Sequence, residues 1–251
     1  MDLGLSGKGV VVTGGSKGIG RAMALAFAAE GAAVATCARG AEALASVEAE
    51  LREIAPRSHC AACDVGDADA LRAFLDAARK ELGSVDVLVN NVSALAMGND
   101  ISAWKASLDV DLLAPVLATE HVIPWMIEAG EGAVIHVSSI SGVEAGSPPA
   151  YAAAKAALIS HAKTMSANLA RKGVRVNTIS PGSIEFPDGV WDVVKKNNRS
   201  MYDGVVASIP GGRMGTPEEV AQAAVFLASP KASWINGVCL YVDGGQHKGN
   251  L

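Results

Sequence analysis

The sequence predicts an α/β fold in which a doubly wound parallel sheet of about seven strands has helices on both faces. Short apolar runs alternate with longer helical patterns along most of the chain. The runs are apolar throughout, as strands covered on both faces by helices must be. A glycine-rich turn separates the first apolar run from the first helical pattern, which is typical of parallel α/β sheets.

Length and composition indicate one domain spanning residues 1–251. Half of the 251 residues are apolar and 27 are glycine. A chain of this size builds one sizeable core and is too short for two comfortable domains. It contains no internal repeat, low-complexity tract or linker at which a boundary would fall.

The first half of the chain alternates strand and helix patterns in order. Helices of this length between strands require crossover connections, and these make the strands parallel. Gly31 is placed to end the first helix. The predicted strands are 10–13, 33–38, 59–63 and 85–89, and the predicted helices are 20–30, 41–54 and 67–82.

The second half continues this alternation up to one irregular segment. A helix that opens within 215–219 has Thr216 as its cap and Pro217 in its first turn. Residues 183–210 mix Gly, Pro, Asn and Asp with aromatic residues, which indicates either a substrate lid or a surface excursion packed by its own aromatics. The other predicted elements are helices 103–129 and 151–170 and strands 134–138, 174–179 and 238–242.

Charge and cysteine usage exclude several classes of partner. The formal net charge is −5, and no dense basic run is present to bind nucleic acid or a membrane surface. The N-terminal residues lack a signal-peptide pattern, so a cytoplasmic protein is expected. Cys60 and Cys63 beside His59 lack the second ligand pair of a zinc site. With Cys37 and Cys239, they are predicted to be buried strand residues, and no metal is expected.

The glycine-rich turn has the sequence TGGSKGIG at 13–20 and predicts a phosphate-binding site. At this position, backbone N–H groups and a helix N-terminus point at a pyrophosphate. The spacing differs from the GxGxxG fingerprint, so the position of the turn carries the argument. Its predicted cofactor contacts are Gly14, Ser16, Lys17, Gly18, Ile19 and Gly20.

The end of the second predicted strand indicates which nicotinamide cofactor binds. An acidic residue there would accept hydrogen bonds from the adenosine ribose and repel a 2′-phosphate. The sequence instead has Arg39, and Lys17 can reach the same corner. Two cations and no carboxylate favour NADP(H) over NAD(H). The alternative is that both are solvated surface charges.

Six further motifs follow the turn in a fixed order. They are Asp64-Val65, Asn90-Asn91, Ser138-Ser139, Tyr151 with Lys155 four residues later, Pro181-Gly182, and Val-Asp-Gly-Gly at 242–245. Over nearly the whole chain, this order resembles the short-chain dehydrogenases/reductases, and the layout resembles that of the 3-oxoacyl reductases. The resemblance implies a Rossmann fold, hydride transfer between the cofactor and a carbonyl or alcohol, and a homotetramer or homodimer.

The resemblance also assigns cofactor contacts outside the turn. Asp64 and Val65 would flank the adenine, and Asn91 would lie along the cofactor. Ile184 would contact the nicotinamide end, and Lys155 would bond the nicotinamide ribose while Tyr151 stands beside it.

Tyr151 and Lys155 are predicted to carry the chemistry. Four residues apart on one helix, they share a face, and a nearby ammonium favours the phenolate form of a tyrosine. Without the surrounding motifs, the same spacing is typical of an exposed helix pair. Tyr151 would exchange the proton of the substrate oxygen, and Ser139 would hold that oxygen. Adjacent strand residues face opposite ways, so only one of Ser138 and Ser139 can do so; counting back from Gly142 favours Ser139.

Three positions depart from the family pattern. Asp111 replaces an Asn that relatives link to a water relay reaching the lysine, so the relay is in question and negative charge is added near Lys155. Val92-Ser93 replaces Ala-Gly after the two asparagines. Phe186 stands where a Thr often touches the carboxamide, so the hold on the cofactor or the shape of the substrate site is expected to differ.

Other functions and the substrate stay open at this point. A nucleotide-binding scaffold or regulator on the same fold, with Asp111 and Phe186 marking lost turnover, is the main alternative. A nucleotide-sugar epimerase or dehydratase is disfavoured by the short chain and the spacing of the turn. The direction of the reaction is not fixed. Val143, Phe186, Trp191 and Tyr202 either line an apolar pocket or pack the 183–210 segment.

Overall fold

The computed structural model describes residues 2–249 and contains a single sheet of seven parallel strands. The strand order is β3-β2-β1-β4-β5-β6-β7, so the order reverses between the central strands β1 and β4. In such sheets the crevice at the reversal, beyond the carboxyl ends of the strands, is where ligands bind. The strands are β1 (Gly9–Thr13), β2 (Ala33–Ala38), β3 (His59–Ala62), β4 (Val87–Asn90), β5 (Gly132–Val137), β6 (Val174–Pro181) and β7 (Cys239–Val242).

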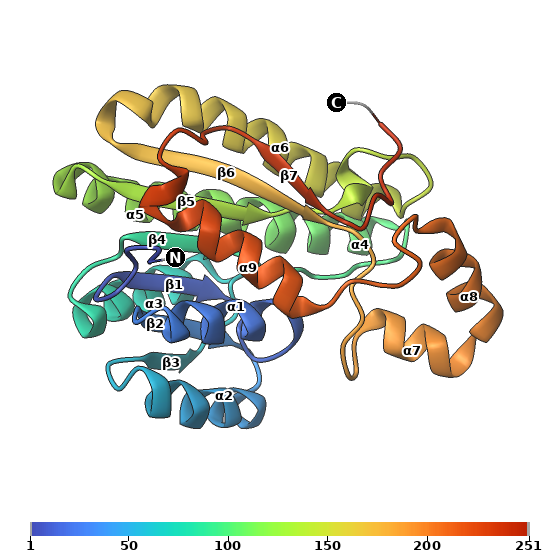
Figure 1. Cartoon of the computed structure of the whole chain (residues 1–251), viewed down its shortest axis with the longest axis horizontal. Coiled ribbons are helices and arrows are strands. Elements are labelled where there is room, and N and C mark those ends of the chain that lie inside the picture. Colours follow the sequence, from blue (N-terminus) through green and yellow to red (C-terminus); the bar gives the residue numbers. More distant parts are fainter. Residues whose placement is uncertain (1, 250–251) are drawn as a thin grey trace.

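Helices cover both faces of the sheet, which confirms the predicted fold class (Figure 1). One face packs against α1 (Gly18–Ala29), α2 (Ala41–Ile54) and α9 (Pro217–Ala228) around Met23, Phe27 and Val220. The other packs against α3 (Ala68–Leu82), α5 (Ala114–Ala129) and α6 (Pro149–Leu169) around Leu75, Val122 and Leu169. Because the central strands β1 and β4 are buried on both faces, their apolar runs show no alternation, whereas the edge strands β3 and β7 are only partly buried.

The helix predicted at 103–129 is longer and less regular than expected. It begins with α4 (Ile101–Ala106), passes through a π-helical segment (Ser107–Leu113) and continues as α5. A π-helical segment inserts residues into an α-helix and is frequent at functional sites. Periodicity alone did not indicate it.

The same helical stretch, Ile101–Ala129, has the length and mean hydropathy, 1.3, of a membrane span. Its core side chains, among them Ala118, Val122 and Met126, are fully buried against the sheet. An apolar composition of this kind is also that of a core helix, which is how the structure uses this part of the stretch.

The irregular segment 183–210 contains two helices that the sequence did not predict, α7 (Val190–Asn197) and α8 (Arg199–Ser208). They lie beside the carboxyl ends of the strands (Figure 1). Tyr202, Ile209 and Met214 form a small buried cluster there, with Trp191 packed against it. The segment is therefore packed by its own aromatics.

Arg175 on β6 ties the end of α9 to the sheet. Its guanidinium donates to the carbonyl oxygens of Leu227 at 2.7 Å, Ala228 at 3.0 Å and Ser229 at 3.2 Å. These are the last carbonyls of a helix, which have no partner within the helix and favour a cation.

We expect Arg175→Met to lower the free energy of unfolding by about 2–3 kcal/mol, because hydrogen bonds to a charged group are lost and buried carbonyls are left unpaired. Urea unfolding followed by circular dichroism measures this. The control is Arg171→Met, an exposed position that should change the stability by less than about 0.5 kcal/mol. Equal effects of the two substitutions would contradict the capping role.

Candidate active site

A cavity of about 930 Å³ opens at the carboxyl ends of the strands, at the place where the strand order reverses. It is large enough for a dinucleotide and a small substrate together. All the site residues predicted from the sequence except Gly18 line it. In chain order these are Gly14, Ser16, Lys17, Ile19, Gly20, Arg39, Asp64, Val65, Asn91, Ser139, Tyr151, Lys155 and Ile184.

The glycine-rich turn is held in place by its neighbours. The backbone N–H groups of Gly14 and Gly15 donate to the Cys37 carbonyl at 2.9 and 3.2 Å. The Asn91 amide donates to the carbonyls of Thr13 and Gly14 at 3.1 and 3.2 Å. Asn91 therefore braces the turn from β4, a role that the sequence did not indicate.

The glycines leave room where side chains would collide. A Cβ on Gly20 would lie 2.1 Å from the Gly14 carbonyl oxygen, so only glycine fits there. Lys17, at the N-cap of α1, makes no side-chain capping bond. The first N–H groups of α1 thus have no capping side chain and can bind an anion.

Phe186, one of the three departures from the family pattern, contacts this turn. A Cβ on Gly18, whose φ is +54°, would lie 2.5 Å from the Phe186 ring. The ring therefore packs directly on the turn and explains why Gly18 is covered rather than open to the cavity. Through Phe186, the first residues of the 183–210 segment touch the phosphate-binding turn.

The end of the cavity near β2 and β3 carries the two predicted cations. Arg39 and Lys17 are exposed, line the cavity, and form no ion pair within residues 2–249. Asp64, which lines the same cavity, accepts a hydrogen bond from the Gly66 N–H at 3.0 Å. Both cations therefore stay available for a ligand.

The four cysteines are free. Cys37 is buried as expected, whereas Cys60 and Cys239 are only partly buried. Cys37 and Cys63 also form part of the cavity wall, which the sequence did not indicate. Within the described residues, no group of three or more His, Cys, Asp or Glu side chains could hold a metal ion.

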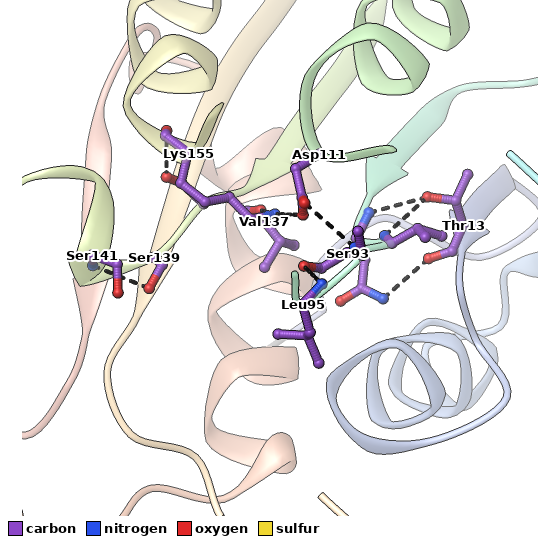
Figure 2. A network of polar contacts seen from close by, with 12 residues as sticks. Thr13, Ser93, Leu95, Asp111, Val137, Ser139, Ser141 and Lys155 are labelled. Atoms are coloured by element: carbon purple, nitrogen blue, oxygen red, sulfur yellow. Dashed lines mark hydrogen bonds and ion pairs between the residues drawn. The ribbon is translucent and has the colours of Figure 1, made fainter. Parts of the chain in front are cut away.

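Lys155 and Tyr151 face each other across one turn of α6. The Lys155 ammonium is 5.7 Å from the centroid of the Tyr151 ring. It donates to the Val137 carbonyl at 3.0 Å and is buried, with 2% of the side chain exposed. Figure 2 shows this long side chain reaching from α6 toward Val137 and Asp111.

The two neighbouring serines have different surroundings. The Ser138 hydroxyl is buried and donates to the Lys155 backbone carbonyl at 2.7 Å, so it ties β5 to α6. Ser139 is partly exposed at the cavity and accepts a hydrogen bond from the Ser141 N–H at 3.1 Å (Figure 2). Of the two, Ser139 has the hydroxyl proton free of a protein partner among the described residues.

Asp111 forms an ion pair with Lys155. Its Oδ1 lies 3.2 Å from the Lys155 Nζ, and its Oδ2 accepts a weak hydrogen bond from the Ala94 N–H at 3.4 Å. The Asp111 side chain is completely buried. The departure at this position therefore places a charge directly against the lysine.

The mouth of the cavity is mostly apolar on one side. Phe186 and Trp191 line it as predicted, with Leu95 and Met97 from the loop after β4. Val143 and Tyr202 do not line it. Val143 lies in an exposed stretch, and the Tyr202 hydroxyl turns away to donate to Glu185 within the 183–210 segment.

Another part of the cavity lining is polar and was not predicted from the sequence. Ser141, Ser147, Glu144 and Gln246 form it. The Gln246 carbonyl oxygen accepts from the Ser183 N–H at 2.8 Å, and Glu144 accepts from the Lys248 N–H at 2.7 Å. The C-terminal residues are thereby fixed beside the cavity. No motif spacing indicated that they reach it.

Comparisons with known proteins agree with this geometry. Residues 14–247 match the family model described as enoyl-(acyl carrier protein) reductase. Isoepoxydon dehydrogenase of Penicillium expansum is 36% identical over 98% of this chain and 97% of its own length. The 3-oxoacyl-[acyl-carrier-protein] reductase of Thermotoga maritima is 35% identical over 96% of this chain and 98% of its own.

Among solved structures, L-sorbose reductase from Gluconobacter frateurii, in complex with NADPH and L-sorbose, superimposes with a TM-score of 0.88. It is 32% identical and the match covers 99% of this chain and 100% of that one. Family model, relatives and structure all span nearly the whole chain. The chain belongs to the short-chain dehydrogenase/reductase family of oxidoreductases.

Proposed function

We propose that this protein is an NADP(H)-dependent oxidoreductase that transfers a hydride between the cofactor and a small carbonyl or alcohol substrate. The observation that carries the proposal is the convergence of Ser139, Tyr151 and Lys155 on the cavity that also contains the glycine-rich turn. Proton-transfer groups and a dinucleotide site within one cavity are what this reaction requires.

The residues present fit a dinucleotide. Glycines without room for a Cβ and an uncapped α1 N-terminus suit the diphosphate. Asp64 and Val65 would flank the adenine, Asn91 would lie along the cofactor, and Ile184 would contact the nicotinamide end. When bound, the nicotinamide supplies or accepts the hydride.

The protein's own side chains manage the proton. In reduction, the Tyr151 phenol donates a proton to the carbonyl oxygen, and in oxidation its phenolate accepts the proton of the alcohol. Ser139 donates a hydrogen bond to the same oxygen and fixes its position. The Lys155 ammonium lies 5.7 Å from the centroid of the Tyr151 ring. It would also donate a hydrogen bond to the nicotinamide ribose.

We expect Arg39→Ala to weaken NADPH binding by about ten- to a hundredfold and to leave NADH binding unchanged, because a charged hydrogen bond to the 2′-phosphate is lost. Fluorescence titration with both cofactors measures this. Arg57→Ala removes an exposed charge outside the cavity and should leave both affinities unchanged. A native protein that binds NADH more tightly than NADPH would overturn the cofactor assignment.

The proposal includes a homodimer or homotetramer in the cytoplasm, without nucleic acid or membrane partners. Trp234, between α9 and β7, is 98% exposed, and tryptophan is enriched in the buried centre of protein interfaces. Its exposure in a single copy of the chain supports a subunit contact at this edge. Analytical ultracentrifugation gives the number of copies directly.

The direct test of the function is NADPH consumption across a panel of carbonyl compounds that differ in ring size, charge and hydroxylation. Turnover of any of them supports the proposal and begins to define the substrate. If NADPH binds tightly and neither reduction nor alcohol oxidation occurs across a broad panel, the nucleotide-binding scaffold becomes the better account.

A further inference from the structure

The ion pair between Asp111 and Lys155 has features that hydride transfer itself does not require. Asp111 and Lys155 are among the most buried charged residues of the described chain, at 0% and 2% side-chain exposure. The buried Oδ1 of Asp111 accepts no hydrogen bond, so the Lys155 ammonium at 3.2 Å is its polar neighbour. A charge at such a site costs several kcal/mol unless it is paired.

The backbone around Asp111 directs this side chain inward. Asp111 lies in the π-helical segment Ser107–Leu113 between α4 and α5, and this segment packs against α6. Asp109, two residues earlier in the same segment, is exposed. One of two neighbouring carboxylates is thus brought against Lys155, while the other stays in solvent.

Few other charges face the pair. On α6 there are Tyr151 and Lys155 themselves, and the loop after β4 contributes only the Ala94 amide. Directly after β5, Ser138 and Ser139 are uncharged, and on β5 His136 is fully buried. Burial, followed by the neighbouring His161 and Lys155, lowers the pKa of His136 to about 3, so it is neutral above pH 5. Glu144 and Asp64 also line the cavity, but within residues 2–249 Asp111 is the carboxylate that forms an ion pair with Lys155.

We propose that Asp111 is a positioning residue that holds Lys155 beside Tyr151 and neutralises the charge of the lysine. Tyr151 then changes from proton donor to proton acceptor at a higher pH than it would with a neutral residue at position 111. This inference rests on the proposed function of Tyr151. An uncompensated ammonium near a phenol stabilises the phenolate, and a paired one does so less. Reduction, which needs the protonated phenol, then stays active to higher pH.

The test is a comparison of native protein with Asp111→Asn, which keeps the shape and removes the charge. We expect Asp111→Asn to fold and turn over. The rising limb of the oxidation profile and the falling limb of the reduction profile should both move about one unit to lower pH. Asp109→Asn removes the same charge from solvent and should move neither limb. Unmoved limbs in an active Asp111→Asn protein would overturn the proposal.

A spectroscopic titration makes the test independent of any substrate. The chain has three tyrosines, and the ultraviolet absorbance of phenolate in the native protein minus that in Tyr151→Phe reports Tyr151 alone. Its midpoint should fall by about one pH unit in Asp111→Asn. If Asp111→Asn does not fold, Asp111→Ser removes the charge with a smaller side chain and is expected to give the same fall. An unchanged midpoint would contradict the role of Asp111, even if no substrate is known. A shifted midpoint in a protein without turnover would count only against the proposed function.

Discussion

Replacing Tyr151 with Phe is expected to reduce turnover about a thousandfold while leaving NADPH affinity within about threefold of native. The substitution deletes the hydroxyl that is proposed to exchange a proton with the substrate oxygen, and it keeps the ring that lies beside the Lys155 ammonium. Steady-state rates with the best substrate of the panel, together with fluorescence titration of NADPH, separate chemistry from binding.

The matched control is Tyr202→Phe, the same chemical change outside the cavity. The Tyr202 hydroxyl donates to Glu185 in the 183–210 segment and does not face the cavity. We expect Tyr202→Phe to lower turnover by less than about tenfold, because it alters only the packing of the 183–210 segment. If Tyr151→Phe retained native turnover, another residue would have to exchange the proton, and the assignment of Tyr151 would be abandoned.

The fold could be predicted from the sequence because the burial of a segment determines which residue types that segment contains. Strands such as β2, covered by helices on both faces, are largely apolar, and the predicted limits of β2 and α2 match the structure residue for residue. Capping chemistry was equally local: Thr216 and Glu219 form the capping box that begins α9. Elements that depend only on neighbouring residues could therefore be predicted from the sequence.

The site could be predicted only in part, because several of its contacts join distant segments. The pairing of Asp111 with Lys155 depends on a π-helical segment that leaves no signal in hydrophobic periodicity. Phe186 packs on Gly18 across 168 positions of the chain. The polar part of the cavity lining around Gln246 exists because residues 246–248 bond to Ser183 and Glu144, which are distant in the chain. Helices α7 and α8 were missed because their apolar residues serve a small local cluster rather than the main core.

The second large effect is expected at Lys155, where one substitution leaves a buried charge without its partner. Lys155→Met removes the ammonium from the completely buried Asp111 carboxylate. We expect the free energy of unfolding to fall by about 3–5 kcal/mol, and turnover to fall with it, because an unpaired charge is far more costly inside a protein than the loss of an exposed pair. Urea unfolding at neutral pH measures the first quantity and NADPH consumption the second.

Two further variants separate burial from charge. Lys196→Met breaks an ion pair with Asp192 whose lysine side chain is 63% exposed, and should cost no more than about 1 kcal/mol. Adding Asp111→Asn to Lys155→Met neutralises both members of the buried pair and should restore most of the lost stability, since replacing a whole buried pair is often neutral. Turnover should stay low in the double variant, because Lys155 is still missing beside Tyr151. Stability that failed to return would mean that Lys155 supports the fold through its packing and its bond to Val137 rather than through the charge of Asp111.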